Sequence, residues 1–207
     1  MNIYEAADNA IRQMNRRNLK AFDRLKLMKR DELHIIREVS TVYDDSAKDA
    51  RTRYYEIATE AYIIAMIQAH KTNAEATRMV DKDITMDWIE EYLEETDYVT
   101  LYRFDTETER KKQRMIEALA ATQEWDKEID KALRYWTLQV GQYAINITDR
   151  ARLLAFKRAG IKRVKWVTKH DERVCGVCDE RDEKIFDIDK VPTKHINCRC
   201  HLLPVFG

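Results

Sequence analysis

The chain has 207 residues, of which 36% are charged and 44% are hydrophobic. A chain of this length can bury one sizeable core but hardly two, and its composition is typical of long, solvated helices. The 37 basic and 37 acidic side chains give a net charge of zero, which excludes a global attraction to nucleic acid.

The scarcity of glycine and proline predicts helices over most of the chain, because the first glycine is Gly141 and the first proline is Pro192. Across residues 7–42, apolar residues recur at alternating spacings of four and three, and only Asn18 and Glu32 interrupt them. This heptad pattern predicts one long helix that packs along other helices.

The next elements are expected to be helical up to a short extended connection. A second helix is expected to begin at the polar cluster 44–46 and to end near residues 72–73. Asp83 or Thr85 can cap a short amphipathic helix that follows. The β-branched and aromatic residues of 96–104 predict an extended connection.

Two further helices are predicted after this connection. The acidic residues of 105–109 suit the positive end of a helix dipole and are expected to lie at a helix N-terminus. Asp126 or Glu128 is expected to open a last long helix, and Gly160 to end it as a left-handed cap.

After this glycine the apolar period changes, and short strands are expected at 161–168, 184–188 and 199–205. The predicted fold is therefore mainly α, with long helices packed as an elongated body and a small C-terminal α+β module of short strands around a Cys/His site. We expect a helical body over residues 1–126 and a module over 127–207 that comprises the last long helix and the β-rich tail.

All four cysteines of the protein lie in this tail, together with three of its five histidines. A Cys-x-x-Cys motif and a His-x-x-Cys motif together supply four sulfur and nitrogen ligands at the spacing of a structural zinc site. The predicted ligands are Cys175, Cys178, His195 and Cys198. Cys200 and His201 are alternatives, since residues two apart on a strand share a face and Cys200 could replace Cys198.

No segment is apolar over the length of a membrane span, and the first residues lack the features of a signal peptide. We therefore expect a protein that is made and kept in a cytoplasm, where clustered cysteines hold metals more often than they form disulfides. Two disulfide bonds are the alternative. Four protein ligands leave no position for substrate or water on the metal, which favours a structural Zn²⁺ and no catalytic residues.

Three other groups of residues favour structural interpretations. The residues 170–172 indicate a charged turn, because no nucleophile or glycine-rich phosphate loop accompanies them. The paired glutamates within 90–95 lack the histidines of a di-metal site and indicate a solvated helix face. Trp125, Tyr135 and Trp136 are interpreted as helix-packing residues.

The segment 144–204 combines an arginine- and alanine-rich helix with a specific set of residues around the cysteines. These are Ala159, Gly160, Ile161, Val164, Trp166, Asp171, Arg173, Cys175, Cys178, Phe186, Pro192, His195, Asn197, Cys198, Arg199, Cys200 and Pro204. In this combination the segment resembles the Mu F-like domain of phage minor head proteins. Many relatives have a proline where this chain has Ile196, which is not a ligand position.

The resemblance implies a minor capsid or head morphogenesis protein, held in a few copies inside the capsid near the portal. Its implied roles are head assembly, DNA packaging or DNA ejection, and its implied partners are the portal protein and other capsid or scaffold proteins. Contact with phage DNA is left open, and no membrane or small-molecule substrate is implied. Some relatives continue into catalytic domains, whereas this chain ends at Gly207, so we expect no enzymatic activity.

Two other classes of function are considered. A zinc-ribbon regulator that binds nucleic acid would turn basic residues of the tail toward phosphates, namely Lys162, Arg163, Lys165, Lys169 and Arg199. A metal-dependent hydrolase would need an open coordination position on its metal.

Overall fold

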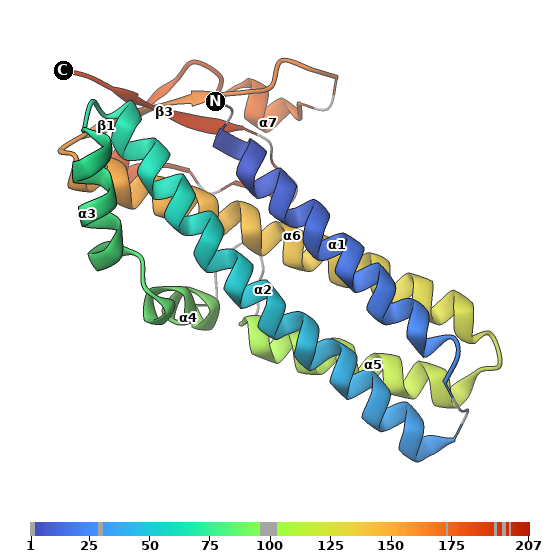
Figure 1. Cartoon of the computed structure of the whole chain (residues 1–207). Helices are drawn as coiled ribbons and strands as arrows, with labels where there is room; N and C mark the ends of the chain where they lie inside the picture. The colour runs from blue at the N-terminus through green and yellow to red at the C-terminus, as the bar shows by residue number, and fades with distance from the viewer. Residues whose placement is uncertain are drawn as a thin grey trace.

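The computed structural model shows a protein made mostly of helices, with a three-stranded antiparallel sheet near its C-terminus (Figure 1). The structure describes residues 3–28, 31–95, 103–172, 174–192, 194–195, 198 and 200–207. The prediction of a mainly helical fold with a small strand-containing module around a Cys/His cluster is confirmed.

The molecule has four long helices among its described residues, and two of them, α2 and α6, form its centre. The four are α1 (Ile3–Leu25), α2 (Glu32–Gln68), α5 (Phe104–Ala121) and α6 (Trp125–Arg158). α2 and α6 pack along each other, and α1 and α5 each pack against both (Figure 1). Aromatic rings fill the space between α2, α5 and α6, where Tyr54 meets Phe104 edge to face at 5.9 Å. The Tyr54 hydroxyl donates to the Val140 carbonyl oxygen at 2.9 Å, which satisfies its buried polar end.

The prediction of one helix across residues 7–42 is wrong, because α1 ends at Leu25 and α2 begins at Glu32. The Asp31 side chain accepts a hydrogen bond from the His34 backbone N–H at 3.1 Å and so caps α2. Apolar residues at heptad spacing are buried on both sides of the break. The spacing alone therefore does not distinguish one long helix from two helices that fold back on each other.

The polar cluster 44–46 does not start a helix either, since it lies inside α2. Ser46 faces the core, where Trp136 Nε1 donates to its hydroxyl oxygen at 2.6 Å and the hydroxyl in turn donates to Asn18 Oδ1. This chain of hydrogen bonds, the Asn18–Ser46–Trp136 relay, joins α1, α2 and α6. It explains why a polar residue interrupts the apolar stripe of α1: Asn18 is buried and hydrogen-bonded.

Two short helices connect α2 to α5. The helix α3 (Asn73–Asp83) was not predicted, although Thr72 and Glu75, which open it with a capping box, have the spacing typical of a helix start. α4 (Met86–Glu94) confirms the predicted amphipathic helix, and Thr85 is the residue that caps it. The extended connection predicted for 96–104 lies mostly outside the described residues, and α5 already begins at its last residue.

The predicted end of the last long helix is confirmed in detail. Gly160 has a φ of 85°, a left-handed conformation that residues with a Cβ rarely adopt. The Gly160 N–H bonds the Lys157 carbonyl oxygen, and the Ile161 N–H bonds the Phe156 carbonyl oxygen, at 3.0 and 2.9 Å. These two bonds form a Schellman motif, which ends α6 and turns the chain into the sheet.

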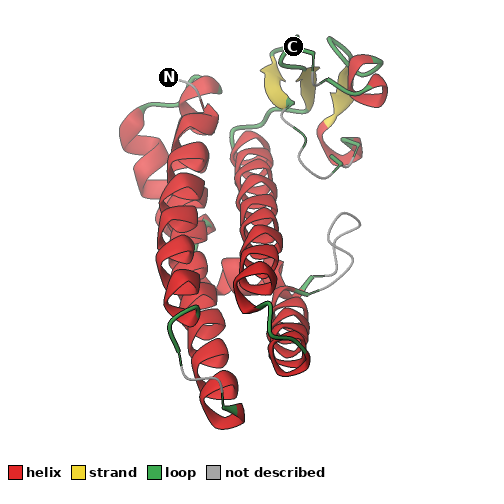
Figure 2. Cartoon of the chain, turned by 90° about the vertical axis from the view of Figure 1, so that its right-hand side faces the viewer, coloured by secondary structure: helices red, strands yellow, loops and turns green. Residues whose placement is uncertain are grey.

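All three predicted strands are present in the tail. They are β1 (Arg163–Val167), β2 (Ile185–Asp187) and β3 (His201–Val205), in the order β2-β1-β3. The register pairs Arg163 with Asp187 on one side and Val167 with His201 on the other. A one-turn helix, α7 (Gly176–Asp179), and a 3-10 turn (Ile188–Lys190) complete the tail. Figure 2 shows the sheet at one end of the long helices.

The buried side chains of helices and tail form one cluster. It includes Tyr54 and Trp136 of the helices together with Trp166 and Leu202 of the sheet. The division at residue 126 stays a prediction. None of the described helices is long and apolar enough to cross a membrane.

Candidate metal centre

The first two potential ligands lie at the one-turn helix α7. Cys175 is the residue before this helix, and Cys178 lies inside it. The Cys178 N–H bonds the Cys175 carbonyl oxygen at 3.0 Å, a tight turn that brings both side chains to the same side. Cys178 is almost completely buried, whereas Cys175 is partly exposed.

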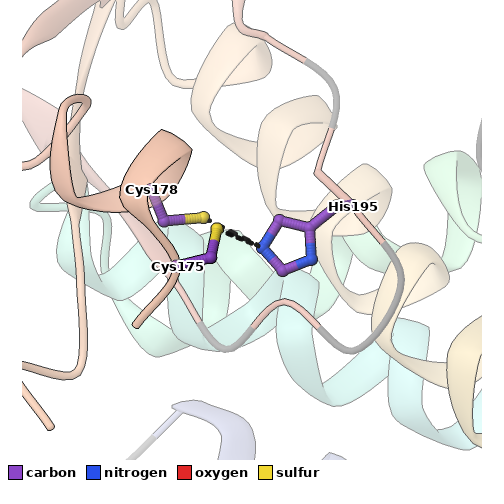
Figure 3. Close-up of side chains that lie close together, drawn as sticks. All are labelled: Cys175, Cys178 and His195. Atoms are coloured by element: carbon purple, nitrogen blue, oxygen red, sulfur yellow. Dashed lines mark hydrogen bonds between the residues drawn. The ribbon is translucent and has the colours of Figure 1, made fainter. Parts of the chain in front are cut away.

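His195 approaches these two sulfurs from another loop of the tail (Figure 3). Its Nε2 atom lies 3.2 Å from the Cys175 Sγ and 3.1 Å from the Cys178 Sγ. The three potential ligand atoms lie within 4.8 Å of one another. The structure therefore brings together three of the four predicted ligands as one group.

A second group of three sulfurs shares Cys178 with the first. Cys178, Cys198 and Cys200 are all buried, and their sulfurs also lie within 4.8 Å of one another. The Cys178 and Cys198 sulfurs are 3.7 Å apart. Cys178 thus belongs both to the group with Cys175 and His195 and to the group with Cys198 and Cys200, and this cluster of donors could hold a metal ion.

None of the four cysteines, all of which the structure describes, forms a disulfide bond. The 3.7 Å between the Cys178 and Cys198 sulfurs is far longer than the roughly 2.05 Å of an S–S bond. His201, the other alternative ligand, belongs to neither group.

The cysteines differ in how readily they ionise. Backbone N–H groups, that of Cys178 first, lower the pKa of Cys175 below its ordinary value of 9.0. Burial raises the pKa of Cys178, and burial raises the pKa of Cys198 to about 11. Without a cation these two side chains remain thiols at neutral pH, so a bound metal would have to displace their protons.

His201 lies in a different environment. Burial, followed by the nearby charge of Arg152, lowers its pKa to about 4. Arg152 of α6 is itself buried, and its Nη2 donates to the Leu202 carbonyl oxygen, which ties β3 to the helix. His201 is therefore a neutral side chain beside the contact between sheet and helix.

The residues that the sequence assigned to structural roles belong to neither group of potential ligands. His170 lies just before a bend, and its Nδ1 is 3.5 Å from Asp182 Oδ2. Glu90 binds Arg51 on a helix surface at 3.1 Å. Trp125 and Trp136 are buried in the helical core, in agreement with their interpretation as packing residues, whereas Tyr135 is about half exposed.

Sequence reasoning missed two charged residues close to the potential ligands. Lys194, directly before His195, is buried and pairs with Asp149 of α6. No sequence motif marks either residue, since Lys194 resembles any of the 37 basic residues until the fold places it beside α6. Its position next to the potential ligand His195 is the one feature of the sequence that could have marked it as part of the site.

The class that this geometry defines is a helical protein with a Cys/His cluster able to hold a metal ion. Comparisons with protein-family models, with curated proteins and with solved structures found no match.

Proposed function

We propose that the tail binds one structural Zn²⁺. The observation that carries this proposal is that four thiol and imidazole donors, Cys175, His195, Cys198 and Cys200, gather around the thiol of Cys178. Zinc prefers these donors, and a tetrahedral site with Zn–S bonds of about 2.3 Å separates its sulfurs by about 3.8 Å. The 3.7 Å between the Cys178 and Cys198 sulfurs is close to that value. Cys175 and His195 would supply two further ligands, and Cys198 or Cys200 the last.

The zinc content of protein purified under reducing conditions tests this proposal. We expect about one equivalent by elemental analysis, and a loss of most of it in Cys178→Ser, which removes the shared donor. Zinc below about half an equivalent, with thiols that react only after reduction, would instead favour the disulfide alternative.

We further propose that the protein acts as a non-enzymatic minor head protein of a phage, near the portal, in head assembly, DNA packaging or ejection. Support comes from the resemblance of residues 144–204 to the Mu F-like domain. Several residues of that pattern, including Trp166, Cys178 and Cys198, are buried together in the tail, as expected for a pattern that specifies a fold. A metal with four protein ligands has no open position for catalysis.

Association with a portal ring tests this role. We expect the chain to co-purify with the portal protein of the same phage, and the complex to persist at high salt. The alternative, a nucleic-acid-binding regulator, predicts an affinity for DNA that falls steeply with salt concentration. Lys165, one of the basic residues that this alternative requires, is already paired with an acid, Glu183, at 2.7 Å, which counts against that alternative.

A further inference from the structure

We propose that Lys194 and Asp149 are positioning residues for the metal centre. They hold the loop that carries His195 and Cys200 against α6, so that both donors reach the metal. This inference rests on the proposed zinc site and adds two residues of the second coordination sphere to it.

The Lys194 ammonium group is surrounded by partners. Its Nζ lies 2.7 Å from Asp149 Oδ2, and the two side chains are only 8% and 12% exposed. The same nitrogen donates to the Cys200 carbonyl oxygen and lies 5.9 Å from the centre of the Trp166 ring. A carboxylate, a carbonyl group and an aromatic face are the partners that a buried ammonium group needs.

These contacts fix the potential ligands at two points. Lys194 directly precedes His195, and the carbonyl group that it binds belongs to Cys200. One ammonium group therefore restrains both ends of the segment that contributes ligands to the two groups of donors. Within this segment the Cys198 N–H also bonds the His195 carbonyl oxygen at 3.1 Å.

α6 provides a rigid base for this arrangement. Asp149 lies inside this helix, and Arg152, one turn further along, binds the Leu202 carbonyl oxygen just after the ligand segment. In metal sites, groups that orient the ligands without touching the metal commonly change affinity 10- to 100-fold when they are replaced. We expect the Lys194–Asp149 pair to act in this way.

Burial distinguishes this pair from the surface pairs of the tail. Lys157 of α6 and Asp189 of the tail are at a similar distance, 2.6 Å, but their side chains are 46% and 77% exposed. An exposed pair contributes little, because water and salt screen it. A buried pair gives little net stability relative to apolar residues of the same size, so we assign this pair a role in the geometry that it imposes.

Cobalt and zinc binding to the full chain tests the proposal. The key variant is the double substitution Lys194→Met with Asp149→Leu, which removes both charges and keeps apolar packing, so its stability is expected to stay close to that of the wild type. We expect its affinity for zinc, measured by competition with a chromophoric chelator, to fall 10- to 100-fold, and its Co²⁺ absorption bands to change. The single variant Lys194→Met is expected to lose zinc affinity as well. Lys194→Arg, which keeps the charge, is expected to keep much more of the wild-type affinity than Lys194→Met.

Asp83→Asn is the matched control. The Asp83 side chain is also 8% exposed and binds Arg158 of α6, but Asp83 is the last residue of α3 and does not belong to the ligand loop. We expect this variant to lose stability and to keep the cobalt spectrum and zinc affinity of the wild type.

Two results would overturn the inference in distinguishable ways. If the double variant and Lys194→Met bind zinc within about twofold of the wild type and keep its cobalt spectrum, Lys194 and Asp149 do not position the ligands, and the metal site stands. If the wild type binds neither metal, the proposed zinc site itself is wrong and the inference is lost with it.

Discussion

Cys178 is the residue on which the candidate metal centre depends most. It is the only member of both groups of potential ligands among the described residues, and it is buried. Its raised pKa means that the apo protein holds a neutral thiol there. A metal would therefore have to release a proton from this residue, so metal affinity should increase with pH.

Asp182 gives a second test at the scale of single residues. Its Oδ1 accepts a hydrogen bond from the buried backbone N–H of Thr168 at 2.7 Å, and this bond lowers the pKa of Asp182 below its ordinary value of 3.8. Because the pKa is lower in the folded state, the charged carboxylate stabilises the fold above about pH 4, and this contribution is lost as the pH falls through the folded pKa.

We expect Asp182→Ala to lower the free energy of unfolding at pH 7 by about 1–3 kcal/mol, since it leaves the Thr168 N–H without this acceptor. Urea unfolding of variant and wild type at pH 7 and pH 3 measures the effect, and the difference should narrow at pH 3. Asp179→Ala, an exposed neighbour, should change stability by less than about 0.5 kcal/mol. A difference that is the same at both pH values would contradict the role of the charge.

At the scale of elements, the end of α6 determines where the tail lies. The Schellman motif at Gly160 reverses the chain direction just before β1, and β3 then packs back on α6. A local signal of one glycine thus positions a sheet whose other strands come much later in the sequence.

Gly160→Ala is expected to lower the free energy of unfolding by about 1–2 kcal/mol, because a residue with a Cβ must adopt a left-handed conformation there. No atom lies within 4 Å of the added Cβ, so the loss arises from the backbone alone. Gly176→Ala is the matched control: it also meets no neighbour, has no positive φ and lies in α7. Chemical denaturation should show no loss for this control, and an equal loss in both variants would refute the explanation.

Local signals explain which parts of the structure could be predicted. Three correctly predicted features depend only on neighbouring residues: the cap at Thr85, the helix end at Gly160 and the Cys-x-x-Cys motif. Each acts within about one helical turn, so the local sequence is enough to predict it. The break before α2 was missed, because the apolar stripe keeps its spacing on both sides of the break, and Asp31, which caps α2, lies outside the stripe. Lys194 was missed because its burial depends on Asp149, which is distant in sequence.

At the scale of the whole molecule, we expect the helices and the tail to differ in what keeps them folded. The packing of α2 on α6 is long and aromatic, whereas the tail consists of short strands whose ligands converge from separate loops. Because small modules of this kind need a metal or another cross-link to stay folded, we expect the tail to depend on its metal more than the helices do.

Metal removal tests this difference. With chelator, or in Cys178→Ser, we expect limited proteolysis to cut within the tail and leave a fragment that contains α1 to α6. The helical circular dichroism signal should stay nearly unchanged. If free zinc exceeds its dissociation constant a thousandfold, the lost stabilisation of the tail is about 4 kcal/mol. A global loss of helical signal would contradict this modular behaviour.

The Asn18–Ser46–Trp136 relay also has a consequence for folding kinetics. The bond between Trp136 and Ser46 joins residues 90 positions apart, and that between Tyr54 and Val140 joins residues 86 apart. Since a chain is synthesised from its N-terminus, α1 and α2 leave the ribosome well before α6, with the faces that α6 will cover still exposed. Closing such long loops slows folding, so the nascent helical hairpin is the species that a chaperone would meet first.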